Sequence, residues 1–466
     1  MVHRKFLAIS EPVQGLLSTS ALLLTARVVG LGAGFATQIL LARLLSPEGL
    51  GIFYFATSIA YVVSMVAAFG YPVIAVRFIS RYRMSDNNAM LAAFITWAQR
   101  DTAIVAFGAM IVVLTVAAAV PGDATTRLAV AVAAFGIPAC ALSRINASVA
   151  GAIRQFTLSY VPDLLWRPLM FLLAMGLFAT FFSAPSPIVA AAAFSVIAVI
   201  IVALQFIGLS RHVPNGIEPI SPHRRLVYQW RVASAPLLIL AAFTTLINDL
   251  NVSLLGMVLP KADLAVLGVC LKLTILVDFA VWLIHQLVAP DISDALALKQ
   301  TALIETAVAR ANIAAMLTTV GATAGVAVFG RYILAAFGPV FVSAYPLLLT
   351  LVAAQLIRAG FGPSVLTLVS AGAQKSVLLV FSITIVILAL GNLLLVPIFG
   401  AIGAVAAFVV MTAFWPAALA VVLKRKTGLR ADIVASFSVL HRMPRSFTRL
   451  SDSIAAKGAT TAHRAN

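Results

Sequence analysis

A small set of ionisable residues lies inside the long apolar stretches of this sequence, where a charged side chain is costly. If such a stretch crosses a membrane, one charge at its centre costs about 2.5–3.5 kcal/mol on insertion scales, so it seldom faces lipid. Guanidinium groups in such places match the geometry of phosphate, and a carboxylate near a histidine is suited to proton binding. The residues are Arg27, Arg100, Arg144, Arg167, Lys272, Arg358, Asp101, Asp163, Asp249, Asp278 and His285.

The composition predicts that these stretches cross a membrane. Of the 466 residues, 62% are hydrophobic and 10% are charged, and the mean hydropathy is +1.07. Soluble proteins average about 45–50% apolar and about 25% charged residues. The runs have the length of spanning helices rather than of barrel strands. We expect an all-α polytopic membrane protein, whose net charge of +17 reflects topology rather than nucleic-acid binding.

Twelve apolar runs are long enough to be transmembrane helices. The sequence predicts them at residues 16–44, 51–76, 91–120, 127–150, 162–182, 187–209, 234–259, 264–290, 311–329, 345–370, 377–396 and 401–423.

Basic residues are distributed unevenly between alternate loops. One set of loops and both chain ends hold most of the Lys and Arg, whereas the opposite set has only Arg43, Arg127, Lys261 and Arg331. Basic loops stay in the cytoplasm, which predicts that both termini are cytoplasmic. The start, MVHRKFLAIS, lacks a small-residue cleavage site and is interpreted as an uncleaved cytoplasmic end.

A weak internal repeat indicates two related halves. Residues 44–58 and 258–272 each end one helix, form a polar turn and begin the next helix, with Leu50 corresponding to Leu264. Such halves are expected to be parallel repeats about an axis along the membrane normal, and transporters often bind substrate at the interface of such repeats.

The longest loop divides the spans six and six. We expect a lobe at 1–209, a cytoplasmic linker at 210–233 and a second lobe at 234–423. A basic cytoplasmic tail at 424–466 is expected to be mostly disordered near anionic lipid heads. The alternative is a short interfacial helix, because Ile433, Phe437 and Leu440 share a helical face.

Several of the ionisable residues have local explanations. Asp163 and Arg167 are four residues apart at the start of the fifth span and are expected to pair with each other. Arg100 lies beside Asp101 near an inner helix end, where a long side chain can reach water. Arg144 is far enough from the outer end of its span to reach the inner interface as well.

Arg27 in the first span has two open interpretations. Counted from Leu45 at about 1.5 Å per residue, it lies about 27 Å inward, close to the inner edge of a core about 30 Å thick. Gly34 and Gln38 share its helical face, and Gly30 lies near it. Such a face either lines a cavity or, as Gly30 and Gly34 favour, packs closely against another helix.

The seventh and eighth spans carry a second group of charges. Asp249 lies in the seventh span, and Lys272, Asp278 and His285 lie in the eighth, where the last two share a face. Lys272 is suited to pair with Asp249 across the helices; otherwise the group lines a central cavity. Asp249, Asp278 and His285 are candidates for binding a coupling ion.

The sequence shows no catalytic constellation, phosphate-binding loop or metal-ligand spacing, so we expect no cofactor and no metal. Cys140 and Cys270 fall inside predicted spans and are interpreted as small packing residues. A membrane acyltransferase would have to use His285, and the outer loops are too short to build its site. Without a nucleotide site, transport would draw on an ion gradient, the membrane potential or a substrate gradient.

The opening of the chain resembles that of oligosaccharide flippases and polysaccharide exporters. The resemblance rests on LLARLLSPEGLG at 40–51, FGYP at 69–72 and RFISRY at 77–82, in that order. The segment INDLNVSLLGMVLPKADLAVLGVCLKL resembles the second repeat of these proteins, with Asp249 at the position of their usual acid. They form the Wzx-type branch of the multidrug/oligosaccharidyl-lipid/polysaccharide (MOP) exporter superfamily.

The resemblance implies a substrate. ARVVGL at 26–31 is similar to a segment of the related lipid II flippases, whose arginine helps to bind a lipid-linked pyrophosphate. Drug-exporting relatives tend to carry an acid in the first helix, so Arg27 favours an anionic substrate. The implied function is movement of a polyprenyl pyrophosphate-linked oligosaccharide across the inner membrane by alternating access. The candidate substrate-binding residues are Arg27, Gln38, Arg144, Asp249, Lys272 and Arg358.

Two alternatives remain open, an ion-coupled drug or metabolite exporter of the same fold and, less favoured, the acyltransferase. The implied partners are the lipid-linked oligosaccharide, the bilayer, and a glycan polymerase with other polysaccharide assembly proteins.

Overall fold

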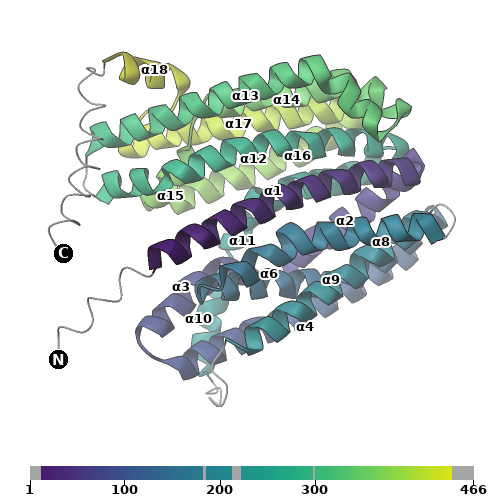
Figure 1. Cartoon of the computed structure of the whole chain (residues 1–466), viewed down its shortest axis with the longest axis horizontal. Coiled ribbons are helices and arrows are strands. Elements are labelled where there is room, and N and C mark those ends of the chain that lie inside the picture. Colours follow the sequence, from purple (N-terminus) through teal and green to yellow (C-terminus); the bar gives the residue numbers. More distant parts are fainter. Residues whose placement is uncertain (1–11, 182–184, 213–221, 298–299, 443–466) are drawn as a thin grey trace. The chain divides into compact units, whose positions relative to one another are not determined.

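The computed structural model describes residues 12–181, 185–212, 222–297 and 300–442, which form helices and no strand (Figure 1). The extreme N-terminus, the middle of the predicted linker and the tail beyond Arg442 lie outside these residues. One π-helical turn, η1 (Pro162–Trp166), and one 3₁₀ turn, η2 (Pro339–Ala344), interrupt the α-helices. The α-helices are α1 (Pro12–Leu44), α2 (Pro47–Ala67), α3 (Tyr71–Met84), α4 (Asn88–Ala119), α5 (Ala124–Ala134), α6 (Gly136–Ala152), α7 (Phe156–Val161), α8 (Arg167–Phe181), α9 (Pro187–Ser210), α10 (Arg224–Ser234), α11 (Leu237–Val258), α12 (Lys261–Ala297), α13 (Thr301–Phe337), α14 (Tyr345–Ala359), α15 (Ser364–Ser370), α16 (Gln374–Phe399), α17 (Ala401–Thr427) and α18 (Ile433–Arg442).

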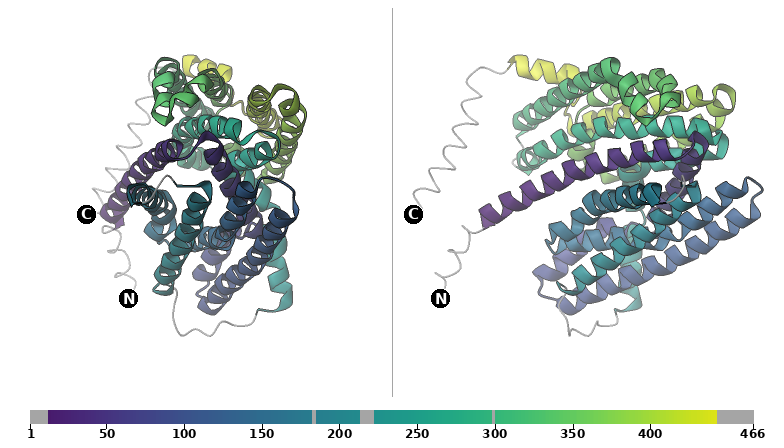
Figure 2. Two further views of the ribbon diagram at one scale, coloured as in Figure 1. Left: turned by 90° about the vertical axis from the view of Figure 1, so that its right-hand side faces the viewer. Right: turned by 45° about the vertical axis from the view of Figure 1, so that its right-hand side comes forward.

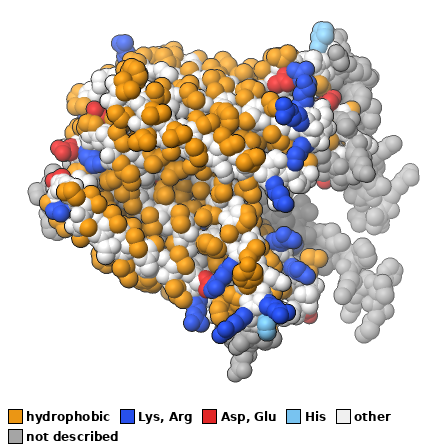
Figure 3. All heavy atoms as spheres, turned by 180° about the vertical axis from the view of Figure 1, so that it is seen from behind, with side chains coloured by type: hydrophobic (Ala, Val, Ile, Leu, Met, Phe, Trp, Pro, Cys, Tyr) orange, Lys and Arg blue, Asp and Glu red, His pale blue; other side chains and the backbone are white. Residues whose placement is uncertain are grey.

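Within the described chain, 12 helical stretches are long and apolar enough to cross a membrane, which confirms the predicted fold class and number of spans. Each overlaps one predicted run, although several are longer, such as Ala302–Phe337 where the sequence predicts 311–329. The alanine-rich ends of this span favour helix beyond its apolar centre. Hydrophobic side chains cover most of the face in Figure 3, as contact with lipid requires.

Local capping explains where the spans begin. The Ser46 hydroxyl accepts a hydrogen bond of 3.1 Å from the backbone N–H of Gly49, and Pro47 occupies the first turn of α2. Ser186 and Pro187 repeat this arrangement at the start of α9. A side-chain oxygen thus satisfies one backbone donor at each of these helix starts.

Packing divides the chain into two compact units. The first comprises residues up to Lys272, Gly330–Leu347 and Phe381–Ala407, and the second comprises Leu273–Phe329, Leu348–Val380 and residues from Phe408 onward. In the first unit, α6 packs against α4 and α9, and α8 packs against α9 (Figure 2). The lobe boundaries predicted at 209 and 234, and the cytoplasmic location of both termini, stay predictions.

The two segments of the internal repeat pack against each other within the first unit. A Cβ atom on Gly51 would lie 1.7 Å from the carbonyl oxygen of Lys261, so these backbones are in direct contact. The Lys261 ammonium lies 4.0 Å from the centre of the Phe55 ring. The symmetry axis that the internal repeat implies stays a prediction.

The second half of the predicted linker is a docked helix, α10. Trp230 of α10 is fully buried, donates a 3.1 Å hydrogen bond to the Tyr82 hydroxyl, and meets the Phe94 ring edge-to-face at 5.1 Å. Val227, one turn earlier, is also buried. The apolar stripe of α10 lies among arginines, so the helix is strongly amphipathic although its average hydrophobicity is low.

An ion pair holds the end of α10 against the spans. Arg231 donates two hydrogen bonds of 2.8 Å to Asp101, which also accepts one of 2.7 Å from the Tyr71 hydroxyl. The hydrogen bonds to Asp101 raise the pKa of Arg231 above its usual value. Arg100, the sequence neighbour of Asp101, instead lies over the Trp97 ring, 5.4 Å from its centre.

Replacing Trp230 with Ala is expected to lower the free energy of unfolding by about 3–5 kcal/mol, because it removes a fully buried aromatic side chain. Tyr228 of the same helix is 68% exposed, so Tyr228→Ala is the matched control, with an expected change within about 0.5 kcal/mol. Thermal unfolding of both variants in detergent measures the difference. Equal effects would show that α10 does not dock through Trp230.

Candidate functional site

A polar cavity of about 270 Å³ lies in the first unit and is called the first-unit cavity below. Its walls come from α2, α6, η1, α8 and α11. Two arginines and two aspartates face it, so its formal charge is balanced. Its lining residues are Tyr61, Cys140, Ser143, Arg144, Asp163, Arg167, Thr245, Leu246 and Asp249.

The π-helical turn η1 presents an ion pair to this cavity. Pro162 has no N–H to donate, and the turn widens there so that the Arg167 N–H bonds the Pro162 carbonyl five residues back. Arg167 donates hydrogen bonds of 2.6 and 3.0 Å to Asp163, which confirms the predicted pairing. Asp163 and Arg167 therefore neutralise each other's charge and also line the cavity.

Arg144 faces the same cavity with unsatisfied hydrogen-bonding capacity. Its side chain is half-buried, and its Nε atom is buried without a hydrogen-bond partner in the described chain. The charge of Arg144 acts on Asp249, which lines the cavity from α11. A buried, unpaired donor on a charged group is costly, so an anionic ligand that reached it would gain a strong hydrogen bond. The structure thus places Arg144, one of the candidate substrate-binding residues, in the lining of a cavity.

Gln38 and Lys272 meet at one tyrosine outside this lining. The Tyr54 hydroxyl donates a 2.7 Å hydrogen bond to Gln38, and the Lys272 ammonium lies 4.9 Å from the centre of the Tyr54 ring. Lys272 therefore lies over an aromatic face, and its charge also acts on Asp249. These contacts provide a structural role for both residues.

The face of α1 that carries Arg27 packs against the fifth span. A Cβ atom on Gly30 would lie 1.7 Å from the Leu164 carbonyl oxygen, and the Thr37 hydroxyl donates a 3.3 Å hydrogen bond to the Pro168 carbonyl. Arg27 itself is half-buried and interacts electrostatically with Tyr160. Of the two interpretations of this face, the close helix contact holds for Gly30.

The second unit holds a separate charged cluster. Arg358 of α14 donates a hydrogen bond to Asp278 of α12 and lies 5.5 Å from the centre of the Trp415 ring. The charge of Arg358 also acts on His285, whose Nε2 atom is buried without a hydrogen-bond partner in the described chain. The structure therefore brings together Arg358, a candidate for substrate binding, and Asp278 and His285, which are candidates for binding a coupling ion.

A double-mutant cycle tests whether Arg358 and Asp278 stabilise the fold as a pair. Removing only Arg358 or only Asp278 leaves a partly buried, uncompensated charge, so Arg358→Leu and Asp278→Leu are each expected to cost about 3 kcal/mol in unfolding free energy. The double variant is expected to be more stable than either single variant. Thermal unfolding provides the measurement, and an additive double variant would contradict the pairing.

The cavity includes polar residues that sequence reasoning missed. Tyr61, Ser143 and Thr245 contribute hydroxyl groups from three helices. Single hydroxyls inside apolar spans usually bond to their own helix, so nothing in their spacing marks them.

The family model described as "Polysaccharide biosynthesis protein" matches residues 16–296, which is more than half of the chain. No curated protein matches the chain.

Solved structures match over most of the chain. An inward-facing multidrug resistance MATE family transporter of the MOP superfamily has 15% identity and a TM-score of 0.68, over 85% of this chain and 95% of its own. Lipid II flippase MurJ, in an inward closed conformation, has 11% identity and a TM-score of 0.69, over 87% of each chain. An outward-facing MATE transporter of the same superfamily has 15% identity and a TM-score of 0.57, and the match covers 87% of this chain and 97% of the transporter. At these identities the matches show that the chain shares the fold of these transporters and of the flippase.

Proposed function

The chain belongs to the polysaccharide biosynthesis protein family, and from this we propose that it moves a lipid-linked oligosaccharide across the inner membrane. The proposed substrate carries its glycan on a polyprenyl pyrophosphate, and two six-helix lobes rock against each other to give alternating access. The lipid tail stays in the bilayer during transfer. A glycan polymerase and other assembly proteins are the proposed recipients of the product.

The observation that carries this proposal is the half-buried Arg144 in the first-unit cavity, with its Nε donor unpaired. A guanidinium binds phosphate oxygens through several donors in one plane, and such charge-assisted bonds are about twice as strong as neutral ones. Arg167 supplies a second guanidinium in the same lining. Because Asp163 already pairs with Arg167, a pyrophosphate would have to compete with that carboxylate.

The cavity volume limits what part of the substrate it can hold. Its volume of about 270 Å³ lies just below the range of about 300–1,000 Å³ for pockets that bind drug-sized ligands. That is enough for a phosphate head group and too little for an oligosaccharide. The sugar chain would therefore extend beyond this cavity.

The other sequence candidates take supporting roles in this proposal. Arg27 captures the head group near the inner end of the first span, and Gln38, Lys272 and Arg358 hold neighbouring helices through their contacts. Among the candidates for ion coupling, Asp249 is favoured over Asp278 and His285 because it lines the cavity that contains Arg144.

A cation-coupled drug exporter is the second candidate function. The observation that favours it is the pair of carboxylates, Asp163 and Asp249, beside the Tyr61 ring in the same cavity, a combination that also suits organic cations. The similar structures include multidrug transporters and a flippase, and no reaction is proposed for the chain.

A deletion strain distinguishes the two functions. Loss of the protein is expected to remove or shorten a surface polysaccharide while drug resistance stays unchanged, and the intact chain supplied on a plasmid is expected to restore the polysaccharide. Increased drug sensitivity with normal surface polysaccharide would support the exporter instead.

A further inference from the structure

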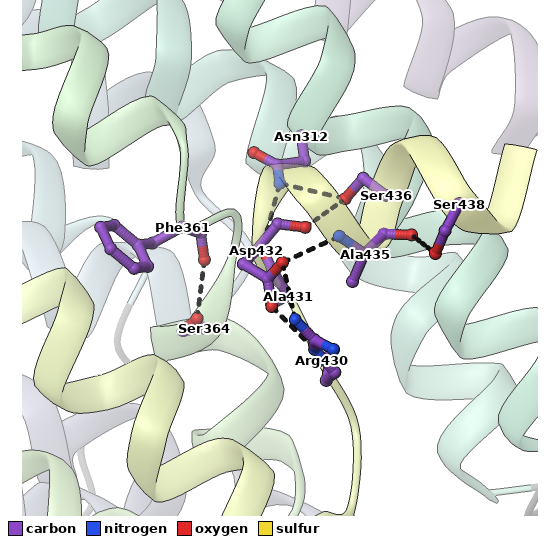
Figure 4. Close-up of polar contacts among 9 residues, drawn as sticks. All are labelled: Asn312, Phe361, Ser364, Arg430, Ala431, Asp432, Ala435, Ser436 and Ser438. Atoms are coloured by element: carbon purple, nitrogen blue, oxygen red, sulfur yellow. Dashed lines mark hydrogen bonds and ion pairs between the residues drawn. The ribbon is translucent and has the colours of Figure 1, made fainter.

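The last described helix, α18, is fastened to the second unit by one face (Figure 4). The fully buried Asn312 of α13 donates hydrogen bonds of 3.0 Å to the Ala431 carbonyl and 3.1 Å to the Ser436 hydroxyl. The backbone N–H of Ile433 donates a 2.8 Å bond to the carbonyl of Gly360, between α14 and α15. The position of α18 is thus set by contacts with α13 and with the connection between α14 and α15.

The start of α18 is equally well defined. The Asp432 carboxylate accepts a 2.8 Å bond from the Ala435 N–H and a 3.0 Å bond from Arg430. Burial opposes ionisation of Asp432, but these hydrogen bonds hold the pKa of its carboxyl below its usual value. A Cβ atom on Gly362, whose φ is +59°, would lie 2.8 Å from the Ala431 carbonyl oxygen. The chain around Ala431 therefore fits closely against the break between α14 and α15.

The opposite face of α18 is exposed and carries two apolar side chains, with Ser438 and His441 beside them. Val434 is 70% exposed and Phe437 is 60% exposed, and they lie three residues apart on one face of the helix. Neither residue belongs to a membrane span. The last turn of α17 ends on the exposed residues Lys424, Arg425 and Lys426, and Arg430 follows in the connection.

The length of α13 indicates the depth at which α18 lies. Arg331, which the sequence places in an outer loop, lies 19 residues from Asn312, or about 29 Å at about 1.5 Å per residue. The hydrocarbon core is about 30 Å thick. Asn312 and the helix fastened to it therefore lie close to the inner edge of the core.

We propose that α18 is a membrane-surface helix that inserts Val434 and Phe437 between the lipids of the leaflet where the last span ends, while the surrounding basic residues bind anionic head groups. An apolar stripe with cationic flanks is the pattern of helices that lie in a charged lipid interface. Asp432, the acid of this segment, is already engaged by Arg430, so the exposed surface is cationic. Anionic phospholipid complements both its charge and its apolar centre.

Spin labels on the full-length protein in vesicles test this proposal. Both native cysteines are buried and should take up little label, so the signal of a label on Phe437→Cys is compared with that of wild-type protein treated in the same way. Met84 is 88% exposed at the end of α3, so a label on Met84→Cys is the aqueous reference. Leu393 is 61% exposed in α16, so a label on Leu393→Cys is the lipid reference. Accessibility to oxygen and to a water-soluble nickel chelate is measured with and without phosphatidylglycerol.

The Phe437 label is expected to lie between the two references and to move toward the lipid reference when phosphatidylglycerol is added. Lys424→Gln with Lys426→Gln is expected to reduce that shift at least twofold. Three results would overturn the proposal: an aqueous label in both lipids, spin–spin broadening that reports a second copy of the chain, or protection from both reagents by a protein partner.

Discussion

Arg144→Ala is expected to abolish glycan export while the protein remains folded and inserted in the membrane. The variant removes the guanidinium whose Nε atom is buried without a partner in the first-unit cavity. Hydrogen bonds to charged groups contribute about 1.5–3 kcal/mol each, so losing one weakens substrate binding about 10- to 150-fold. A deletion strain that produces the variant at normal level, scored by its surface polysaccharide, provides the measurement.

Two matched variants make the result specific. Arg144→Lys keeps the charge but not the planar array of donors, so we expect partial export. Arg100→Ala removes an arginine that lies over Trp97 in another span and lines no part of this cavity, so we expect full export. Normal export by Arg144→Ala would exclude the role proposed for this residue.

Gly51→Ala is expected to lower the free energy of unfolding more than any other glycine-to-alanine change at the contact between residues 44–58 and 258–272. Its Cβ atom would lie 1.7 Å from the backbone oxygen of Lys261, and a backbone atom cannot rotate away as a side chain can. Overpacking a well-packed contact costs about 1–3 kcal/mol, and this site lies at the upper end of that range or above it. Thermal unfolding in detergent measures the effect.

Gly176→Ala in α8 is the matched control, because nothing lies within 4 Å of the added Cβ atom. Glycine inside a helix is about 0.5–1 kcal/mol less favourable than alanine, so this control is expected to be slightly stabilising. If both variants unfold at the same temperature, residues 44–58 and 258–272 do not form the close contact described above.

The fold was largely predictable from the sequence, because helices that cross a membrane need about 20 predominantly apolar residues each. Runs of apolar residues with polar turns such as that at Ser46 identify the spans with little ambiguity. Helix α10 was not predicted, because its arginine-rich segment is too polar to be a span and was interpreted as a linker, although Val227 and Trp230 share a helical face. The sequence also favoured a disordered tail after residue 424, whereas contacts from Asn312 hold residues 433–442 as a helix.

The candidate site was predictable only in part. The spacing of Asp163 and Arg167 predicts their ion pair, since residues four apart on a helix are neighbours. That both side chains share a cavity with Arg144 and Asp249 depends on packing between helices far apart in the sequence, which spacing does not encode. Arg27 was the first sequence candidate for substrate binding because its segment resembles one in lipid II flippases. The helix face that carries it is used in part for packing, since Gly30 contacts the backbone of Leu164.

We propose that this protein moves a pyrophosphate-linked glycan between leaflets and that Arg144 binds its head group. The most direct measurement uses purified protein in vesicles that contain a polyprenyl pyrophosphate bearing one fluorescent sugar. A membrane-impermeant quencher then reports how fast the sugar changes leaflet. We expect the intact chain to raise this rate above that of protein-free vesicles, and Arg144→Ala to return it to that level. A rate unchanged by the intact chain would contradict the proposed function, and a rate raised equally by Arg144→Ala would contradict the proposed site.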